Sequence, residues 1–546
     1  MKKITAVFCA ALLTFSLFSC GKDEKGSGAN HMYDVPLSGN PQSLDPQFAN
    51  DPSSNTVIKN LYSGLMYSDE NGNILCRNAE SYTISPDKMT YTFTLRQDNY
   101  WFFDSNGDDS IGDDEYFPVT AKDYIFALQR ILDPKMQSPY AKNFMCIKNG
   151  SSIINGEAAP ENAGISAPDD YTLEITLDYP SAEFLGMLST AAAFPCNQEF
   201  FNSTKGRYGL DDKSIMSNGP FYVRQWFFDP YGNHNILYMR RNEINANEDF
   251  KVLPAYVSFT IQDSDDDVHS LFKEGKVECF STLSSSYSKN KYSIKSSSAI
   301  TLGLIFNPED RYFSNTNMRK ALAYSIDRNT LGNRIGNDDD IKMASGLIPP
   351  AVRLAGRNYR ELSSDSQFSL YNPDEAKKCL QDAKNELNIG SVESVKILVN
   401  AETADSGDLH LLSQSWQETL GVYIGIEDVT AEEFERRIAD GNYSIALYPL
   451  KGDLCSGLSV ISQFEVENCL KLMAGDTGFT EKILKCSDVS SLVDTYTEIE
   501  KNIINGLSFI PLFYKNAYLV SSKDNESLIY DPFTGAIDYR LAQNFS

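Results

Sequence analysis

The chain has 546 residues, of which 42% are hydrophobic, so it can bury a core and is long enough for more than one domain. It carries 48 Lys and Arg against 74 Asp and Glu, a formal net charge of −26. That acidity argues against nucleic-acid binding, because affinity for phosphates is built from Lys and Arg.

The first twenty residues, 1–20, have the pattern of a lipoprotein signal peptide. Lys2 and Lys3 form a positive start, and 4–18 is an apolar run too short for an ordinary membrane span. The four residues that end at Cys20, "LFSC", resemble a bacterial lipobox, in which this cysteine is lipidated and becomes the first mature residue. A plain secretory signal or an uncleaved anchor is the alternative.

The segment that follows, 21–31, is rich in Gly, Lys and Asp and predicts a flexible tether. No later apolar run reaches the roughly 18 residues of a membrane span. We therefore expect a folded body that a lipid holds at the extracytoplasmic face of the bacterial cell membrane.

The next elements are short strands, helices and turns. "YTFTLR" (91–96) and "YTLEITL" (171–177) alternate apolar and polar residues, as half-buried strands do. "VTAKDYIFALQRIL" predicts a helix with Thr120 as N-cap and Asp123 completing a capping box. "NTNMRKALAYSI" and "YNPDEAKKCLQDAKNEL" predict two more helices, the second capped by Asn372. The mixture indicates an α/β fold.

An acidic stretch, "FDSNGDDSIGDDEYF", starts at Phe103 and precedes the first of these helices. Aligned to an EF-hand calcium loop, its ligand positions fall on Asp104, Asn106, Asp108, Ser110 and Glu115. Asp109 replaces the glycine that makes the sharp turn of such loops, and Pro118 prevents a flanking helix. A structural calcium site is one interpretation, and a solvated acidic insertion is the other. We expect no required cofactor.

Signals of catalysis are scarce. The chain has four histidines, and it contains no HExxH, GxSxG or GxxxxGK[ST] motif. Apart from Cys9 and Cys20, eight cysteines are scattered without a CxxC pair, which argues against a zinc site. Some of them could pair, for example Cys455 with Cys469, or all could be free buried thiols. The sequence leaves both options open.

An ordered set of segments carries a resemblance to a known family. It comprises "GNPQSLDPQFANDPSSNTVIKNLYSGLMYSDENGNILCRNAE", "VTAKDYIFALQRILDP", "NGPFYVRQW", "GLIFNPEDRYFSNTNMRKALAYSIDRNTL", "GLIPP", "YNPDEAKKCL" and "LLSQSWQETLGVYIGIEDVTAEEFERRIADGNYSIALYPL". Together these segments resemble the extracellular solute-binding proteins of family 5, the oligopeptide-binding type. The resemblance runs from about Asp34 to Leu519.

The resemblance implies a periplasmic-binding-protein fold of the class II, or cluster C, type. Two lobes are then built from three domains around a hinged ligand cleft. The expected limits are 32–75, 206–301 and 506–546 for a discontinuous domain I, 76–205 for domain II and 302–505 for domain III.

The implied function is that of a monomeric lipoprotein that captures oligopeptides and delivers them to the permease subunits of an ABC importer, without catalysis. Two segments are expected to line the cleft: Asn40, Pro41, Gln42 and Ser43, and Pro449, Leu450, Lys451, Gly452 and Asp453. Asp453 is the expected partner of a peptide's amino terminus.

Two alternatives stay open. The same scaffold could bind another solute such as an oligosaccharide, because 30 Tyr and 31 Phe can stack on sugars. A secreted peptidase-like enzyme on this scaffold is the less favoured reading. Ligand length and the identity of the permease are not indicated.

Overall fold

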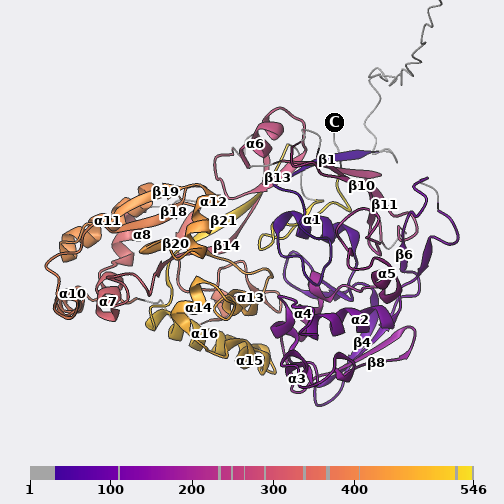
Figure 1. Cartoon of the computed structure of the whole chain (residues 1–546), viewed down its shortest axis with the longest axis horizontal. Coiled ribbons are helices and arrows are strands. Elements are labelled where there is room, and N and C mark those ends of the chain that lie inside the picture. The colour runs from indigo at the N-terminus through magenta and orange to yellow at the C-terminus, as the bar shows by residue number, and fades with distance from the viewer. Residues whose placement is uncertain are drawn as a thin grey trace, which may run out of the picture.

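The computed structural model describes residues 31–543 except 109–110, 232–234, 247–249, 263–264, 288–290, 336–339, 364–368, 405 and 523–526. The expected signal peptide with Cys20, and the tether as far as residue 30, lie outside the described residues. Figure 1 shows two lobes, a left one built from the orange part of the chain and a right one built from the indigo and magenta parts. The yellow C-terminal segment lies between them.

A four-stranded sheet in the right lobe joins two distant parts of the chain. Its order is β1 (Met32–Leu37), β12 (Tyr256–Ile261), β11 (Ile236–Arg241) and β10 (Phe221–Phe227), with β1 parallel to β12 and the other pairs antiparallel. The C-terminal segment is attached to the same body through α1 (Pro52–Leu61). Asn60 of this helix donates to the carbonyl of Ile537 at 2.7 Å and accepts the backbone N–H of Tyr539 at 2.9 Å.

A second sheet in the right lobe is local in sequence. It is antiparallel in the order β4 (Ala79–Ile84), β5 (Thr90–Leu95), β9 (Thr172–Thr176) and β8 (Ile165–Asp169). Helix α2 (Ala121–Leu132) packs beside it, and the Asp123 carboxylate accepts the backbone N–H of Thr120 at 2.8 Å. The predicted strands and this predicted capped helix are therefore confirmed.

The largest sheet extends into the left lobe. Its order is β13 (Cys279–Thr282), β21 (Ile510–Ser521), β14 (Ser293–Phe306), β20 (Ile445–Leu450), β18 (Lys396–Asn400) and β19 (Gly425–Val429), and β15 (Ile341–Met343) also pairs with β21. Helices cover it in the left lobe, among them α7 (Thr316–Tyr324), α8 (Arg328–Ile335), α10 (Pro373–Leu387), α11 (Ser406–Leu420) and α12 (Ala431–Ala439).

Two of the predicted helices are α7 and α10. In α10, the Asn372 side chain accepts the backbone N–H of Glu375 at 3.1 Å, as expected of an N-cap. In α7, Met318 and Leu322 are buried on one side, and Ile326 just beyond the helix is buried with them. Both predicted helices are confirmed.

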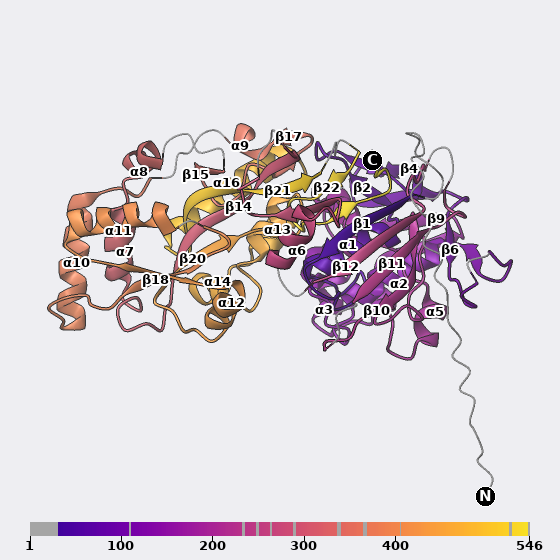
Figure 2. The same ribbon diagram turned by 90° about the horizontal axis from the view of Figure 1, so that it is seen from above.

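The chain passes between the lobes along β14 and β21, which lie side by side between them (Figure 2). The two strands pair antiparallel from Ser293 with Ser521 to Leu304 with Ile510. The register shifts between Ser298 and Ile300 and again between Leu302 and Gly303. Such bulges bend a strand locally, so we identify the paired strands β14 and β21 as the hinge between the lobes.

The expected domain limits can be placed on these elements. The limit at 302 falls inside β14, and the limit at 506 falls between α16 (Val489–Asn505) and β21. The local sheet of β4, β5, β9 and β8 lies within 76–205. The limits themselves stay a prediction.

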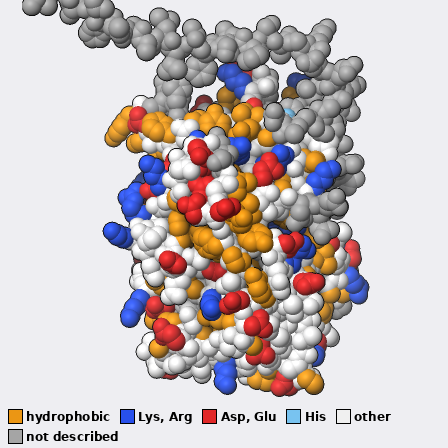
Figure 3. Space-filling view, turned by 90° about the vertical axis from the view of Figure 1, so that its right-hand side faces the viewer, with side chains coloured by type: hydrophobic (Ala, Val, Ile, Leu, Met, Phe, Trp, Pro, Cys, Tyr) orange, Lys and Arg blue, Asp and Glu red, His pale blue; other side chains and the backbone are white. Residues whose placement is uncertain are grey.

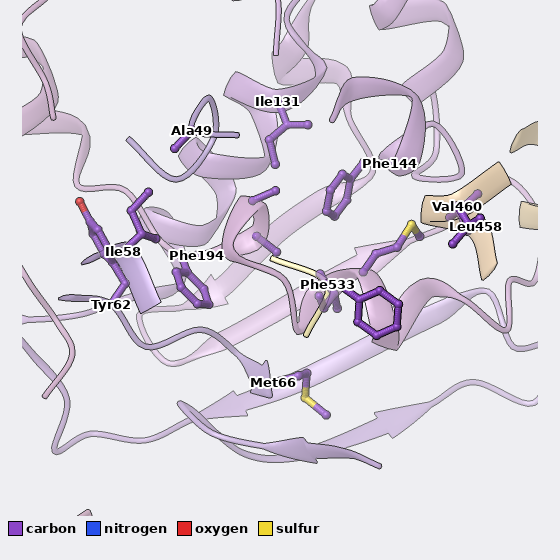
Figure 4. Close-up of a cluster of buried hydrophobic side chains, with 14 of the residues drawn as sticks. Ala49, Ile58, Tyr62, Met66, Ile131, Phe144, Phe194, Leu458, Val460 and Phe533 are labelled. Atoms are coloured by element: carbon purple, nitrogen blue, oxygen red, sulfur yellow. The ribbon is translucent and has the colours of Figure 1, made fainter. Parts of the chain in front are cut away.

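One hydrophobic cluster contains residues from both lobes, and Figure 4 shows part of it. Phe144, Phe194 and Phe533 belong to it, together with Leu458 and Val460 of α13 (Gly457–Ser462). The lobes therefore touch through apolar side chains as well as through the hinge.

Figure 3 shows the end face of the right lobe, where acidic, basic and apolar side chains are interspersed and several acidic side chains lie next to one another in the upper part. Within the described ranges, the helices include none with the length and apolar content needed to cross a membrane.

A buried ion pair ties 45–47 to α2. The Arg130 guanidinium donates to the Asp45 carboxylate, and it also donates to Gln47 Oε1 at 2.7 Å. Both charged side chains are almost fully buried, at 4% and 8% exposure. The amide of Gln47 then donates to the carbonyls of Ala192 and Phe194. This network links the segment before α1 to the local sheet domain.

We predict that Arg130→Ala lowers the free energy of unfolding by about 3–5 kcal/mol, because it leaves the Asp45 carboxylate buried without its counter-charge. Urea unfolding followed by circular dichroism measures the loss. Lys122→Ala is the control, since the Lys122–Asp170 pair on the same helix is largely exposed and contributes less than about 1 kcal/mol. Equal losses in the two variants would contradict the prediction.

Candidate functional site

A cavity of about 1190 Å³ lies between the lobes. Its walls come from all three expected domains: the end of α1, the turn between β2 (Met66–Ser68) and β3 (Ile74–Cys76), 182–194, the start of β14, 350–355, 453–458 and 529–536. A space of this size at a domain interface is typical of a ligand site.

Much of the wall is apolar. It includes Phe144, Met187 and Phe194 on one side and Leu458 and Phe533 on the other. The start of β14 adds three serines at 296–298. β20 pairs with β14 only from Thr301 onward, so this serine segment has no β20 partner. The Ser298 carbonyl accepts the backbone N–H of Ala351 at 2.9 Å, and the rest of the segment's free edge can accept an extended ligand as an added strand.

Acidic groups are present on one part of the wall. Burial, together with the nearby Asp531 carboxylate, raises the pKa of Asp453 to about 6. The Asp531 side chain accepts the backbone N–H of Phe533 at 3.0 Å, which fixes it at the start of its own turn. Two carboxylates that face one cavity make a site for a cation.

Basic groups lie elsewhere on the wall. Lys295 pairs with Glu70 at 2.9 Å and also donates to the carbonyl of Leu528. Arg353 packs its stem against Gly72, where a β-carbon would lie 2.8 Å from the Arg353 Cβ. Within the described part of the chain, neither Arg353 nor Lys59 has a carboxylate at ion-pairing distance. They are therefore available to an anionic group of a ligand.

The lobes also touch directly beside this cavity. The backbone N–H of Ala182 donates to the carbonyl of Cys486 at 2.7 Å. The carboxylate of Glu183 accepts hydroxyl hydrogens from Ser456 and Tyr496. These contacts join 182–183 to residues of the opposite lobe, so the structure represents a closed arrangement.

The expected cleft residues of the first segment are not among the residues that line the cavity. Asn40 Oδ1 accepts the indole N–H of Trp226 at 2.8 Å, and Ser43 Oγ accepts the backbone N–H of Asp45 at 3.1 Å. Pro41 is buried and Gln42 is exposed. Contact of these four residues with a ligand stays a prediction.

Within the second expected segment, Asp453 lines the cavity. Pro449 and Leu450 are the last residues of β20 and pair with Leu302 and Thr301. Lys451 is exposed, and Gly452 is buried where a β-carbon would lie 2.1 Å from Ser459 Oγ. These four residues therefore hold the loop that presents Asp453, and their contact with a ligand stays a prediction.

Seven charged residues of the wall were not predicted: Lys59, Asp69, Glu70, Glu183, Lys295, Arg353 and Asp531. Arg353 follows the "GLIPP" segment, which was part of the resemblance, and Asp531 begins a turn that contains Pro532 and Gly535. These local signals were available, but the charges meet at one cavity only through the fold.

All eight cysteines in the described residues are free. The suggested pairing of Cys455 with Cys469 is therefore not formed. Cys455 lines the cavity, and burial raises the pKa of its thiol to about 11.

Comparison with known proteins gives consistent matches. The model of the bacterial extracellular solute-binding proteins, family 5 Middle, matches residues 77–466. The dipeptide-binding protein DppE of Bacillus subtilis is 22% identical over 568 residues, covering 99% of both chains. The oligopeptide-binding protein AliB of Streptococcus pneumoniae is 27% identical over 477 residues, covering 77% of this chain and 70% of its own.

Solved structures share the fold. Listeria monocytogenes OppA bound to peptide aligns with a TM-score of 0.69 and 23% identity, over 95% of this chain and all of the other (100%). The substrate-binding domain of an oligopeptide ABC transporter from Bacillus anthracis aligns with a TM-score of 0.72 and 22% identity, over 95% and 99%. The expected two-lobed α/β periplasmic-binding-protein fold is thereby confirmed.

The acidic loop lies between β6 (Tyr100–Phe102) and β7 (Tyr116–Pro118), away from the cavity. Glu115 is buried and accepts the backbone N–H groups of Ser105 and Gly112. Asp104 accepts the N–H of Gly107, and the guanidinium of Arg224 lies 3.9 Å from its other oxygen. Asn106 accepts the N–H of Asp108. These bonds order the loop around three of the expected ligand side chains: Asp104, Asn106 and Glu115.

The calcium site itself stays a prediction, and Ser110 lies outside the described residues. No group of three or more His, Cys, Asp or Glu is placed for a metal ion within the ranges that the structure describes.

We predict that millimolar calcium raises the melting temperature by about one to three degrees, since extracellular calcium loops bind at about 10⁻⁴ to 10⁻³ M. Differential scanning calorimetry with calcium and with chelator measures the shift. Asp108→Asn should abolish the rise, whereas Asp113→Asn should retain it, because Asp113 is equally exposed but outside the aligned ligand positions. If the melting temperature is the same with calcium and with chelator, the stretch is a charged surface loop and not a calcium site.

Proposed function

The chain belongs to the bacterial extracellular solute-binding proteins of family 5, and from this premise we propose that it captures short peptides in the cavity between its lobes and delivers them to an ABC permease. Its family is one of binding proteins and not of enzymes. We accordingly propose capture and release without chemical change of the ligand.

The observation that carries the proposal is that carboxylates and basic groups share the wall of one cavity. Asp453 and Asp531 form an acidic end without a protein counter-charge that would hold down the pKa of Asp453. Arg353 and Lys59 provide basic groups elsewhere on the same wall. A peptide carries an amine at one end and a carboxylate at the other, so both of its termini find an opposite charge.

The rest of the cavity wall also suits a peptide chain. The serine segment of β14 offers backbone groups to an extended main chain, and the apolar wall offers surface to varied side chains. The names of similar proteins support this reading, since DppE and AliB are called dipeptide-binding and oligopeptide-binding. The Listeria monocytogenes OppA structure holds a peptide.

Delivery follows from closure. A ligand that touches both lobes stabilises the closed arrangement over the open one. A permease that recognises the closed surface would then receive loaded protein. We propose that the chain acts as a monomer in this role.

We predict that the mature body binds a tetrapeptide with a free amino terminus, and that Asp453→Asn weakens this binding about tenfold or more through loss of a charge-assisted bond. The affinity advantage of the wild type over Asp453→Asn should shrink as the pH drops from 7 to 5, because protonation through a pKa of about 6 removes the Asp453 charge. Isothermal titration calorimetry at several pH values measures both effects, and mass spectrometry checks that the peptide is unchanged.

The acetylated tetrapeptide is the ligand control, and it should lose little affinity in Asp453→Asn. Asp69→Asn is the protein control: Asp69 also lines the cavity, but its carboxylate accepts the backbone N–H groups of Asn71 and Asn73. Equal weakening for both peptides would remove Asp453 from the amine site. A protein that retains no peptide at all would refute the proposed function.

We also propose that a lipid on Cys20 anchors the protein to the extracytoplasmic face of the cell membrane. The proposal rests on the short apolar run that ends in Ser19 and Cys20. Two or more acyl chains give a stable anchor, at about 0.8 kcal/mol per buried CH₂.

We predict that Cys20→Ala moves the protein from the membrane fraction to the soluble or secreted fraction. Detergent-phase partitioning of cells that express each form measures the change. Cys9→Ala, inside the expected signal peptide, should leave the partitioning unaltered. Membrane association that survives in Cys20→Ala would show that the anchor is not this lipid.

A further inference from the structure

Glu183 is a buried carboxylate whose two oxygens are both occupied by the opposite lobe. It precedes α4 (Phe184–Leu188) in the expected domain II and is 5% exposed. Its Oε1 accepts the hydroxyl of Tyr496 at 2.6 Å, and its Oε2 accepts the hydroxyl of Ser456 at 2.7 Å. Tyr496 belongs to α16 and Ser456 is the N-cap of α13, both in the expected domain III.

The charge on this carboxylate has no cation beside it. Among the described residues, no Lys, Arg or His forms an ion pair with Glu183. Burial raises its pKa, and the two hydroxyl donors oppose that rise only in part. The other titratable groups that face it are Tyr496, Cys455 and Cys486, and burial raises the pKa of each. Those three stay neutral near pH 7, so Glu183 is the member of this cluster that changes charge.

The contact also reaches the ligand site. Ser456 lies three residues after Asp453 in the loop that leads into α13, and both residues line the cavity. Glu183 therefore holds this loop from the opposite side. When the lobes part, Glu183 loses both donors at once and becomes solvated, and the loop is released.

We propose that Glu183 is a positioning residue that latches the lobes together, and that its protonation state sets how readily they part. The closed arrangement buries the carboxylate, whereas the open one exposes it to water. A carboxyl group with a higher pKa in the closed form binds a proton more tightly there. The closed form is therefore more favoured over the open form as the pH falls, and less favoured as the pH rises. The link to Asp453 rests on the proposed function, but the latch itself does not.

The test follows closure without any ligand. The Ala182 N–H bond to Cys486 crosses between the lobes, so hydrogen exchange at Ala182 reports their opening. In the ligand-free full chain, Tyr496→Phe should quicken this exchange about tenfold, because a hydrogen bond to a charged group is lost. Mass spectrometry of peptic fragments that cover Ala182 measures it.

The matched control is Tyr359→Phe. Tyr359 donates to Glu500 at 3.0 Å, which is also a buried tyrosine–glutamate bond, but both residues lie in one lobe. This variant can lower the melting temperature, but it should leave exchange at Ala182 unchanged. The proposal is overturned if Tyr496→Phe exchanges at Ala182 as slowly as the wild type, or if Tyr359→Phe quickens it equally.

A second variant, Glu183→Gln, tests the role of the Glu183 charge, and it replaces the first test if Tyr496→Phe fails to fold. Both arms carry Asp453→Asn, so that the titration of Asp453 does not contribute. After correction for intrinsic exchange chemistry, opening with Glu183 intact should increase between pH 5 and pH 8, whereas Glu183→Gln should flatten this slope. Identical slopes refute the role of the charge. If the variants differ in exchange at Ala182 as expected but the protein binds no peptide, only the proposed function is refuted.

Discussion

The paired strands β14 and β21 constrain everything else in this molecule, because the chain enters and leaves the left lobe through them. Their ladder of hydrogen bonds makes the two crossings move as one ribbon. At one bulge, Gly303 packs so tightly that a β-carbon there would lie 2.1 Å from the Phe509 ring. Sliding one strand past the other would break this ladder, whereas the two bulges allow the ribbon to bend. The polar contacts beside the cavity then hold the lobes in the closed position.

The closed cavity combines two electrostatic situations that differ in cause. At Asp453, burial and a neighbouring carboxylate both disfavour charge, and a bound cation relieves both. At Glu183, burial disfavours charge as well, but the space around its oxygens is already filled by hydroxyl groups. The first carboxylate is thus open to a ligand, whereas the second is committed to the protein. An acid that lines a cavity is a ligand group only if its acceptors are unoccupied.

Sequence patterns predicted the structural features that depend only on residues close together in the chain. The box of Thr120 with Asp123 and the cap of Asn372 formed as expected, because each needs only residues within one helical turn. The fold followed from an ordered resemblance that covers most of the chain.

The ligand wall was harder to predict, because its charges come from Lys59, Arg353 and Asp531, which lie far apart in sequence. Asn40 was expected in the cleft, but its side chain binds Trp226, which is 186 residues away. No periodicity encodes such a contact.

The eight free thiols bear on how the protein matures. Thiolates, not thiols, attack disulfides and are oxidised, and burial raises the pKa of Cys146, Cys196 and Cys279 to about 12. At neutral pH these groups are almost wholly protonated, and they are enclosed by the core. These three thiols are therefore poor nucleophiles for disulfide exchange in the folded protein. Once the core has closed, its cysteines behave as small apolar side chains.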